Sequence, residues 1–234
     1  MQQFRDQYHN SVFYLLLLAL GTLVAFWPTY FSIFREAPAH AHAHGLAMSA
    51  WLLLLISQAW LIRSGRRDLH RLVGRSSFVI VPLVIFTTMS FAHATLERDG
   101  LVPPRPYIFY LQMQLLVAFS LCYALAIYNR RRPAVHARFM ICTALVMIDP
   151  ILARVVFFYL WEPGSMVLLQ VVTYTVTDLA LVALIAADFR REWRLKVYPA
   201  MLGVFLLLQI PNFLITGSAW WRGVAAWYLA LPLP

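Results

Sequence analysis

Residues 40–63 read HAHAHGLAMSAWLLLLISQAWLIR, and the apolar run inside this stretch decides the class of fold. No charged residue lies between Leu46 and Ile62. A helix of roughly 20 apolar residues crosses the hydrocarbon core of a bilayer, which is about 30 Å thick. Backbone groups in lipid must find their hydrogen bonds within the segment, which favours a helix over an open strand. The stretch therefore predicts a transmembrane helix over residues 40–63.

Six further stretches share this length and apolar character. The seven predicted spans cover about residues 11–34, 40–63, 70–95, 107–129, 137–160, 165–188 and 197–217. The sequence thus predicts an all-α integral membrane bundle of about seven transmembrane helices in contact with the lipid bilayer. We expect residues 1–218 to form one transmembrane domain. The Trp-rich residues 219–234 are too short for another span and are expected to form an interfacial tail.

The composition agrees with a membrane protein and argues against other classes. Hydrophobic residues make up 62% of the 234 residues and charged residues 12%, whereas soluble domains are about 45–50% apolar and about 25% charged. The formal net charge of +9 comes from short basic clusters between the spans, so we do not expect a nucleic-acid partner. The first span is too long for a secretory signal and no small-residue cleavage site follows it, which predicts a retained membrane anchor.

Three alternate links between the spans are rich in basic residues. They contain Arg63, Arg66, Arg67, Arg71 and Arg75, then Arg130, Arg131, Arg132 and Arg138, then Arg190, Arg191, Arg194 and Lys196. The other links contain only Arg35, Arg98 and Arg105. Basic loops stay in the cytoplasm. This bias predicts a cytoplasmic N-terminus and a C-terminus on the outer side.

Four residues near the outer ends of the second and third spans could form a metal site. His40 and His44 are four residues apart and would share one face of a helix that has already begun at this point. His93 lies 23 residues after His70, about 35 Å along the helix, and Glu97 follows one turn later. Imidazole and carboxylate ligands suit zinc, iron or copper. The alternative is that these histidines are hydrated residues of the headgroup region.

Two more histidines, His70 and His136, each begin a span after an arginine-rich turn on the inner side. Helix capping or contact with lipid phosphates would explain them. A second interpretation is that histidines at two levels of the bilayer hold b-type haem, since haem iron takes axial histidine ligands. The candidate cofactor ligands are then His44, His93, His70 and His136. The expected cofactor is haem b or a transition metal, with no cofactor as the alternative.

Charged residues inside the spans are expensive in lipid and are candidates for function. The sequence places Asp149, Arg154 and Asp178 there, and Pro150 predicts a kink because it removes one helix hydrogen bond. Arg154 could pair with Asp149, Asp178 or Glu97 and fix the packing. Alternatively, the carboxylates could form a proton path or hold a metal.

Other polar residues in the spans have simpler explanations. Tyr174 lies one turn before Asp178 and could hydrogen-bond to it. Cys122 and Cys142 are expected to be small buried thiols. Glutamine side chains are expected to form hydrogen bonds between helices; they are Gln58, Gln112, Gln114, Gln170 and Gln209.

The stretch HGLAMSAWLLLLISQAWLIRSGRRDLHRLVGR (44–75) and the later VHARFMICTALVMIDPILAR (135–154) resemble a family of uncharacterised bacterial multi-pass membrane proteins. The matching residues are His44, Gln58, Gly65, Arg66, His70, Arg71, Gly74, Arg75, His136, Arg138 and Met140. The resemblance covers roughly residues 44–155 and does not include His40, His42 or His93. It implies a location in the bacterial cytoplasmic (inner) membrane. The family is distantly similar to haem-bearing cytochrome b bundles and to oxidase-assembly membrane proteins.

Three classes of function follow from these residues. The histidines favour a haem or metal protein that acts in electron transfer or respiratory-complex maturation, with a membrane redox partner. Asp149, Asp178 and the proline kink favour a proton-coupled carrier with a small-molecule substrate. A structural or assembly protein would need no site. The sequence does not decide whether the protein is an enzyme.

Overall fold

A computed structural model describes residues 10–161, 164–189 and 196–233. Over these residues the chain is all-α and contains no strand. Seven helical segments are long and apolar enough to cross a membrane, which confirms the predicted number of spans. They are Ser11–Phe31, Ala39–Arg63, Arg67–Asp99, Arg105–Tyr128, Pro133–Leu160, Met166–Phe189 and Val197–Leu214. The chain thus has the architecture of an integral membrane protein. It divides into two compact units, Met1–Phe91 and Ala92–Pro234.

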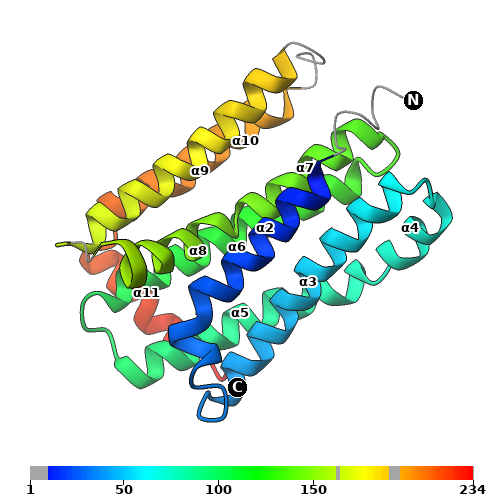
Figure 1. Cartoon of the computed structure of the whole chain (residues 1–234). Coiled ribbons are helices and arrows are strands. Elements are labelled where there is room, and N and C mark those ends of the chain that lie inside the picture. The colour runs from blue at the N-terminus through cyan, green and yellow to red at the C-terminus, as the bar shows by residue number, and fades with distance from the viewer. Residues whose placement is uncertain (1–9, 162–163, 190–195, 234) are drawn as a thin grey trace. The chain divides into compact units, whose positions relative to one another are not determined.

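The first unit is built from helices α2 to α5 (Figure 1). They are α2 (Ser11–Phe26) with a π-helical extension η1 (Trp27–Phe31), α3 (Ala39–Arg63), α4 (Arg67–Gly74) and the part of α5 (Ser77–Asp99) that ends at Phe91. α3 packs against α2 and α4. Pro38 precedes the first residue of α3, so all three histidines of the AHAHAH run are helical.

The turn between α3 and α4 depends on two glycines of the sequence pattern. Gly65 has φ +76°, a conformation that side-chain-bearing residues rarely adopt. Gly74 lies at the end of α4, where a Cβ atom would be 3.3 Å from Oε1 of Gln58. The glycines therefore reverse the chain and let α4 approach the end of α3.

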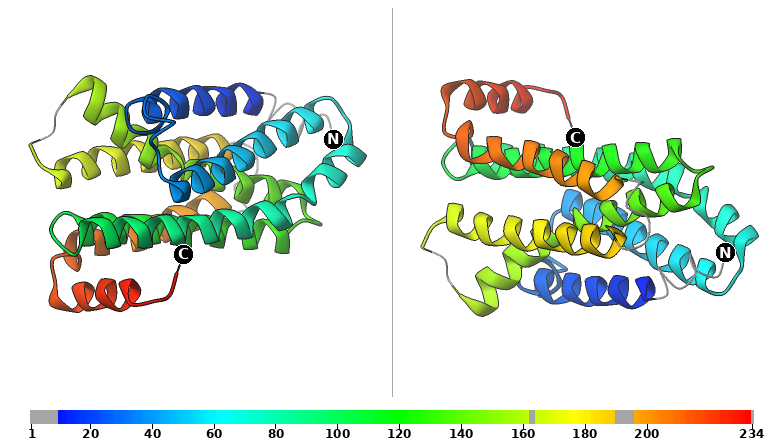
Figure 2. Two further views of the ribbon diagram at one scale, coloured as in Figure 1. Left: turned by 90° about the horizontal axis from the view of Figure 1, so that it is seen from below. Right: turned by 90° about the horizontal axis from the view of Figure 1, so that it is seen from above.

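The second unit begins with the end of α5 and continues through six further α-helices. These are α6 (Arg105–Tyr128), α7 (Pro133–Leu145), α8 (Ile148–Val155) with its extension η2 (Val156–Leu160), α9 (Met166–Phe189), α10 (Val197–Leu214) and α11 (Ala219–Leu229). α6 packs on α7, α10 packs on both α6 and α9, and α8 packs on α9. α9 and α10 run side by side (Figures 1 and 2).

The predicted tail contains a helix, α11, that packs on the beginning of α6. Nε1 of Trp221 donates a hydrogen bond of 2.7 Å to the carbonyl of Pro106, and its ring stacks on Phe109. Trp220 and Trp227 are exposed on the other side of the helix. One face of α11 thus holds it to the bundle, and its exposed tryptophans fit an interfacial location.

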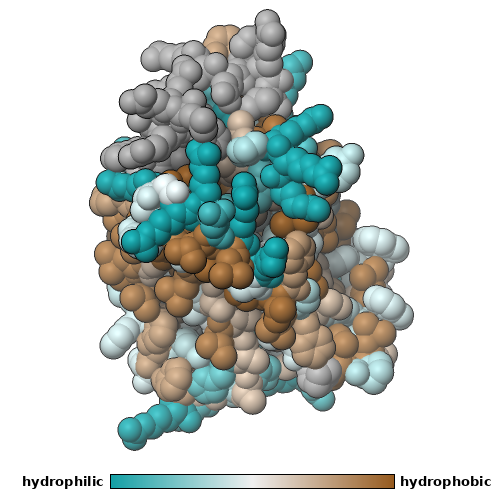
Figure 3. Space-filling model, turned by 90° about the vertical axis from the view of Figure 1, so that its right-hand side faces the viewer, coloured by the Kyte–Doolittle hydropathy of each residue, from teal (hydrophilic) through white to brown (hydrophobic). Residues whose placement is uncertain are grey.

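Large apolar side chains cover much of the surface of the helices (Figure 3). Leu46, Leu207 and Leu214 are each more than 70% exposed. In water such exposure would be unfavourable, but lipid chains are as apolar as leucine. This surface is therefore the expected one for helices that contact a bilayer.

Candidate functional site

The candidate site is a buried group of polar side chains in the second unit, built by α6, α8, α9 and α10. It is centred on Asp149, which is 2% exposed. The span that carries Asp149 is interrupted: α7 ends at Leu145 and α8 begins at Ile148. Pro150 explains this break, because its nitrogen cannot donate to the carbonyl four residues earlier. The predicted kink is confirmed, and it places Asp149 in the first turn of α8.

Asp149 contacts α9 through one of its two oxygens. Nε2 of Gln170 donates a hydrogen bond of 2.6 Å to Oδ1 and one of 2.9 Å to Oγ1 of Thr173. The other carboxylate oxygen, Oδ2, is buried and has no hydrogen-bond partner among the described residues. A buried polar atom without a partner is rare and marks a place where a further ligand or proton is expected.

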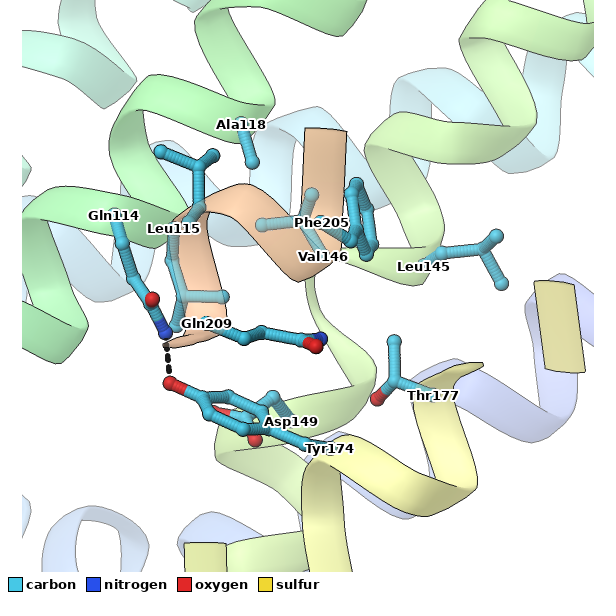
Figure 4. A pocket seen from close by; sticks show the side chains of 11 residues that line it. Gln114, Leu115, Ala118, Leu145, Val146, Asp149, Tyr174, Thr177, Phe205 and Gln209 are labelled. Carbon is cyan, nitrogen blue, oxygen red and sulfur yellow. Dashed lines mark hydrogen bonds between the residues drawn. The ribbon is translucent and has the colours of Figure 1, made fainter. Parts of the chain in front are cut away.

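The hydroxyl of Tyr174 connects three helices beside Asp149. It accepts a hydrogen bond from Nε2 of Gln114 on α6 (Figure 4). It accepts a second one, at 3.0 Å, from Nδ2 of Asn212 on α10. Oε1 of Gln114 is buried and unpartnered within the described part of the chain. Tyr107 lies next to the amide of Asn212. The sequence suggested that Tyr174 hydrogen-bonds to Asp178. Its hydroxyl instead reaches across the bundle.

Asp178 lies one turn further along α9 and bonds to α10. Nε2 of Gln209 donates to its Oδ1 at 3.1 Å. Five glutamines were predicted to form hydrogen bonds between helices. Gln114, Gln170 and Gln209 form such bonds.

A small cavity lies between these groups (Figure 4). It offers about 20 Å³ to the centre of a water molecule, enough for about one water. Its polar wall is formed by Gln114, Asp149, Tyr174, Thr177 and Gln209. Asp149 of α8 and Tyr174 and Thr177 of α9 therefore face a space inside the bundle that holds about one water molecule.

Asp149 lies near one cationic side chain, Arg154. Arg154 interacts electrostatically with Asp149, and its Nη1 donates to the carbonyl of Pro150 at 3.0 Å. Asp178 lies outside this pair, and its carboxylate accepts the hydrogen bond from Gln209. An ionised carboxylate inside a bilayer is expensive, and a proton on Asp149 would remove that charge.

Arg138 and Asp188 form a second buried pair, which the sequence did not reveal. Arg138 is fully buried, and its Nε and Nη2 donate to the two carboxylate oxygens of Asp188 at 2.5 and 2.9 Å. Nη1 donates to the carbonyl of Ala134 at 2.9 Å. This pair is neutral as a whole and joins α7 to α9. Asn212, Thr173 and Tyr107 of the main site were also missed.

The three histidines of the AHAHAH run lie on different sides of α3. His40 and His44 both contact the ring of Phe91, and Nδ1 of His44 is 3.4 Å from the hydroxyl of Thr88. His42 instead packs on Phe34, and its Nδ1 is 2.9 Å from the hydroxyl of Tyr30. His40 and His44 thus share a face, as their spacing predicts. His70 lies in α4.

The histidines of the second unit are each bonded to a backbone carbonyl. Nε2 of His93 is 3.1 Å from the carbonyl of Leu229, at the end of α11. Nδ1 of His136 is 2.8 Å from the carbonyl of Ala126. Glu97 is exposed. Among residues 10–161, 164–189 and 196–233, no three His, Cys, Asp or Glu side chains are close enough to hold a metal ion. The haem and metal sites therefore stay predictions.

The two cysteines are free and buried, as predicted. Their thiols hydrogen-bond to each other between α6 and α7.

The site thus combines a buried carboxylate, unpartnered buried acceptors and a cavity beside a broken helix. Comparisons with protein-family models, with curated proteins and with solved structures found no match to this chain.

Proposed function

We propose that the protein is a proton-coupled membrane carrier in which Asp149 takes up and releases the proton. The observation that supports this most directly is the buried, unpartnered Oδ2 of Asp149 beside the cavity. Protonation of this oxygen would remove the charge of a carboxylate that is buried inside a membrane span. The bond from Gln170 to Oδ1 stabilises the charged form, so both protonation states have a structural basis.

The broken helix adds support for a carrier. Carriers commonly build their binding sites at discontinuous spans, because irregular backbone inside a membrane is tolerated where it lines a cavity. Here the break between α7 and α8 lies next to Asp149, and Leu145 and Val146 at the break line the cavity. A change in the charge of Asp149 would therefore act where the span is already interrupted.

Infrared difference spectroscopy on the reconstituted protein tests the protonation step. We expect the carboxylic C=O band of the wild-type protein to change between mildly acidic and mildly alkaline buffers. Asp149→Asn should abolish this change, and Asp68→Asn should retain it because Asp68 is fully exposed on α4. A wild-type spectrum that does not respond to pH would overturn the proposal.

Transport is measured in proteoliposomes that contain a pH-sensitive dye. Small polar solutes are added outside, and proton movement that depends on the solute should occur with the wild-type protein and fail with Asp149→Asn. If Asp149 titrates but no solute moves protons, the protein is a structural membrane protein with a buried acid.

We propose the bacterial cytoplasmic (inner) membrane as the location, with the N-terminus in the cytoplasm. The family resemblance supports the membrane, and the arginine-rich links support the orientation.

Haem or metal binding is a second candidate, supported by His136. Its Nδ1 contacts the carbonyl of Ala126, and ligating histidines commonly donate their other ring nitrogen to such a carbonyl. A visible spectrum with a Soret band, or metal found by elemental analysis of the purified protein, would support this function. In that case His44→Ala should lower the occupancy strongly and His42→Ala only slightly. A colourless, metal-free protein would exclude it.

A further inference from the structure

We infer that α4 is an interfacial helix that binds anionic phospholipids. The inference concerns the first unit alone and is independent of the proposed carrier function. It rests on three features of residues 63–75: a helix that the membrane crossing does not need, an exposed apolar face, and a cluster of arginines.

The first feature is the length of the third apolar segment. Arg67–Asp99 has 33 residues, which corresponds to about 50 Å of helix. α5 alone has 23 residues, or about 35 Å, and is long enough to cross a hydrocarbon core of about 30 Å. α4 connects the end of α3 to the beginning of α5 and packs on α3 (Figure 1). It therefore lies at one boundary of the membrane and is not needed for the crossing.

The second feature is an apolar face on α4 that the protein leaves exposed. Leu69, Leu72 and Val73 are three and four residues apart, share one side of the helix and are all exposed. Gly74 lies on another side, which approaches Gln58 of α3. An isolated helix of eight residues is marginal in water. Burial of the apolar face among acyl chains would stabilise it.

The third feature is the positive charge around this face. Residues 63–75 contain five arginines and one aspartate, which gives a net charge of +4. All five arginines are exposed; they are Arg63, Arg66, Arg67, Arg71 and Arg75. Arg71 pairs with Asp68 at 3.6 Å, but both side chains are exposed, so this ion pair is weak. Basic clusters on an amphipathic helix attract anionic lipids.

The ends of α4 carry the arginines that are best placed to reach phosphate groups. Arg66 precedes the helix and Arg75 follows it. The guanidinium of Arg66 lies 5.5 Å from the centre of the Trp60 ring, a cation–π contact. Trp60 is exposed near the end of α3, and tryptophan favours the headgroup level. A guanidinium at this level can bind a phosphate through two hydrogen bonds.

The link between α6 and α7 provides a contrast within the same chain. Residues 130–132 are three consecutive exposed arginines, but they form a turn with no apolar helix face. This link has the positive charge of a basic loop alone. Residues 63–75 combine the charge with an apolar face, which selects a lipid with an anionic headgroup over a soluble anion or a zwitterionic lipid.

Hydrogen–deuterium exchange of the full chain in nanodiscs tests the inference. Nanodiscs of phosphatidylcholine are compared with nanodiscs of equal parts phosphatidylcholine and phosphatidylglycerol. We expect the backbone amides of residues 67–75 to exchange about tenfold or more slowly in the anionic nanodiscs, since each arginine near an anionic surface adds to the binding. Concentrated salt should reduce this difference, because it screens exposed charges.

Two pairs of substitutions locate the effect of charge. Arg66→Gln with Arg71→Gln should abolish the slower exchange, because two lost arginine contacts weaken binding by about tenfold or more. Arg131→Gln with Arg132→Gln is the matched control. It removes the same charge from the other link and should keep the slower exchange. All four side chains are exposed, so neither pair removes a buried contact.

A third pair, Leu69→Ser with Leu72→Ser, tests the apolar face. It keeps every charge and should also abolish the slower exchange in anionic nanodiscs.

The other outcomes overturn the inference. Equal exchange of residues 67–75 in the two kinds of nanodisc would mean that α4 does not bind anionic lipid, and its exposed face would then fit a protein partner. Equal losses in the two arginine pairs would mean that only the net charge of the protein matters. Slower exchange that persists in the leucine pair would exclude an interfacial helix. Inorganic phosphate that slows exchange in phosphatidylcholine nanodiscs would indicate a site for soluble anions.

Discussion

Arg138 in the middle of α7 and Asp188 near the end of α9 are joined by two parallel hydrogen bonds of 2.5 and 2.9 Å. Arg138 is completely buried, and the side chain of Asp188 is 11% exposed. The residues are 50 positions apart in the sequence. The pair therefore fixes the packing of two spans that both contribute to the cavity.

Removal of one partner of this pair should destabilise the protein strongly. Arg138→Met removes the arginine from the buried carboxylate of Asp188, and such changes cost about 3–5 kcal/mol of the free energy of unfolding. The double variant Arg138→Met with Asp188→Leu should recover most of that loss. Denaturant titration in mixed micelles measures the free energy of unfolding of the single and the double variant.

Arg71→Met is the control. It should change the free energy of unfolding by less than about 0.5 kcal/mol, because the ion pair of Arg71 with Asp68 is exposed. Equal effects of Arg138→Met and Arg71→Met would contradict the structural role.

The sequence predicted the spans well because lipid imposes one length and one composition on each of them. It also predicted the break at Pro150, since the loss of a helix hydrogen bond is a local property. It placed Arg138 among the basic residues of a cytoplasmic link, because a run from Arg130 to Arg138 satisfies the positive-inside rule. Only the structure shows that this arginine is buried and bonded to Asp188 of α9.

The candidate site was predicted in part, for a similar reason. Asp149 and Asp178 stand out as charges in apolar spans, and Gln114, Gln170 and Gln209 stand out as polar residues there. Which residues meet depends on how the helices rotate, and the hydrophobic pattern of a span that is apolar on all sides does not reveal this rotation. The convergence of Gln114 and Asn212 on Tyr174 therefore needed the structure.

The turn between α3 and α4 should be sensitive to substitution at Gly65. This residue has φ +76°, so Gly65→Ala should cost about 1 kcal/mol through backbone strain, although no atom lies within 4 Å of the new Cβ. Gly65→Asn should cost less, since asparagine tolerates this conformation. In contrast, Gly203→Ala in α10 also meets open space and should stabilise the protein by roughly 0.5–1 kcal/mol. Thermal unfolding of the three variants in detergent distinguishes strain from crowding.

Cys122 and Cys142 should form a disulfide when the protein is treated with a membrane-permeant oxidant such as diamide. They are the only two cysteines, and their thiols hydrogen-bond to each other. Each thiol loses a proton and one electron, and diamide takes up both electrons and both protons. Mass spectrometry of the unfolded monomer should then find no alkylatable thiol, whereas Cys122→Ser should keep the thiol of Cys142. Two reactive thiols after oxidation would mean that α6 and α7 are not in this register.

The orientation in the membrane can be tested with reporters at two positions. With seven spans, the ends of the chain lie on opposite sides, and the arginine-rich links predict that the N-terminus is cytoplasmic. A periplasmic reporter inserted in the link at residues 100–104 should be active, and a reporter that requires the cytoplasm should be inactive when it is fused after Pro234. Insertion of the periplasmic reporter at residues 130–132, between α6 and α7, provides the opposite control and should give no activity. Activity at both insertion points would mean that the span Arg105–Tyr128 does not cross the membrane. Reversed activities would invert the orientation and place the Arg138–Asp188 pair on the outer side.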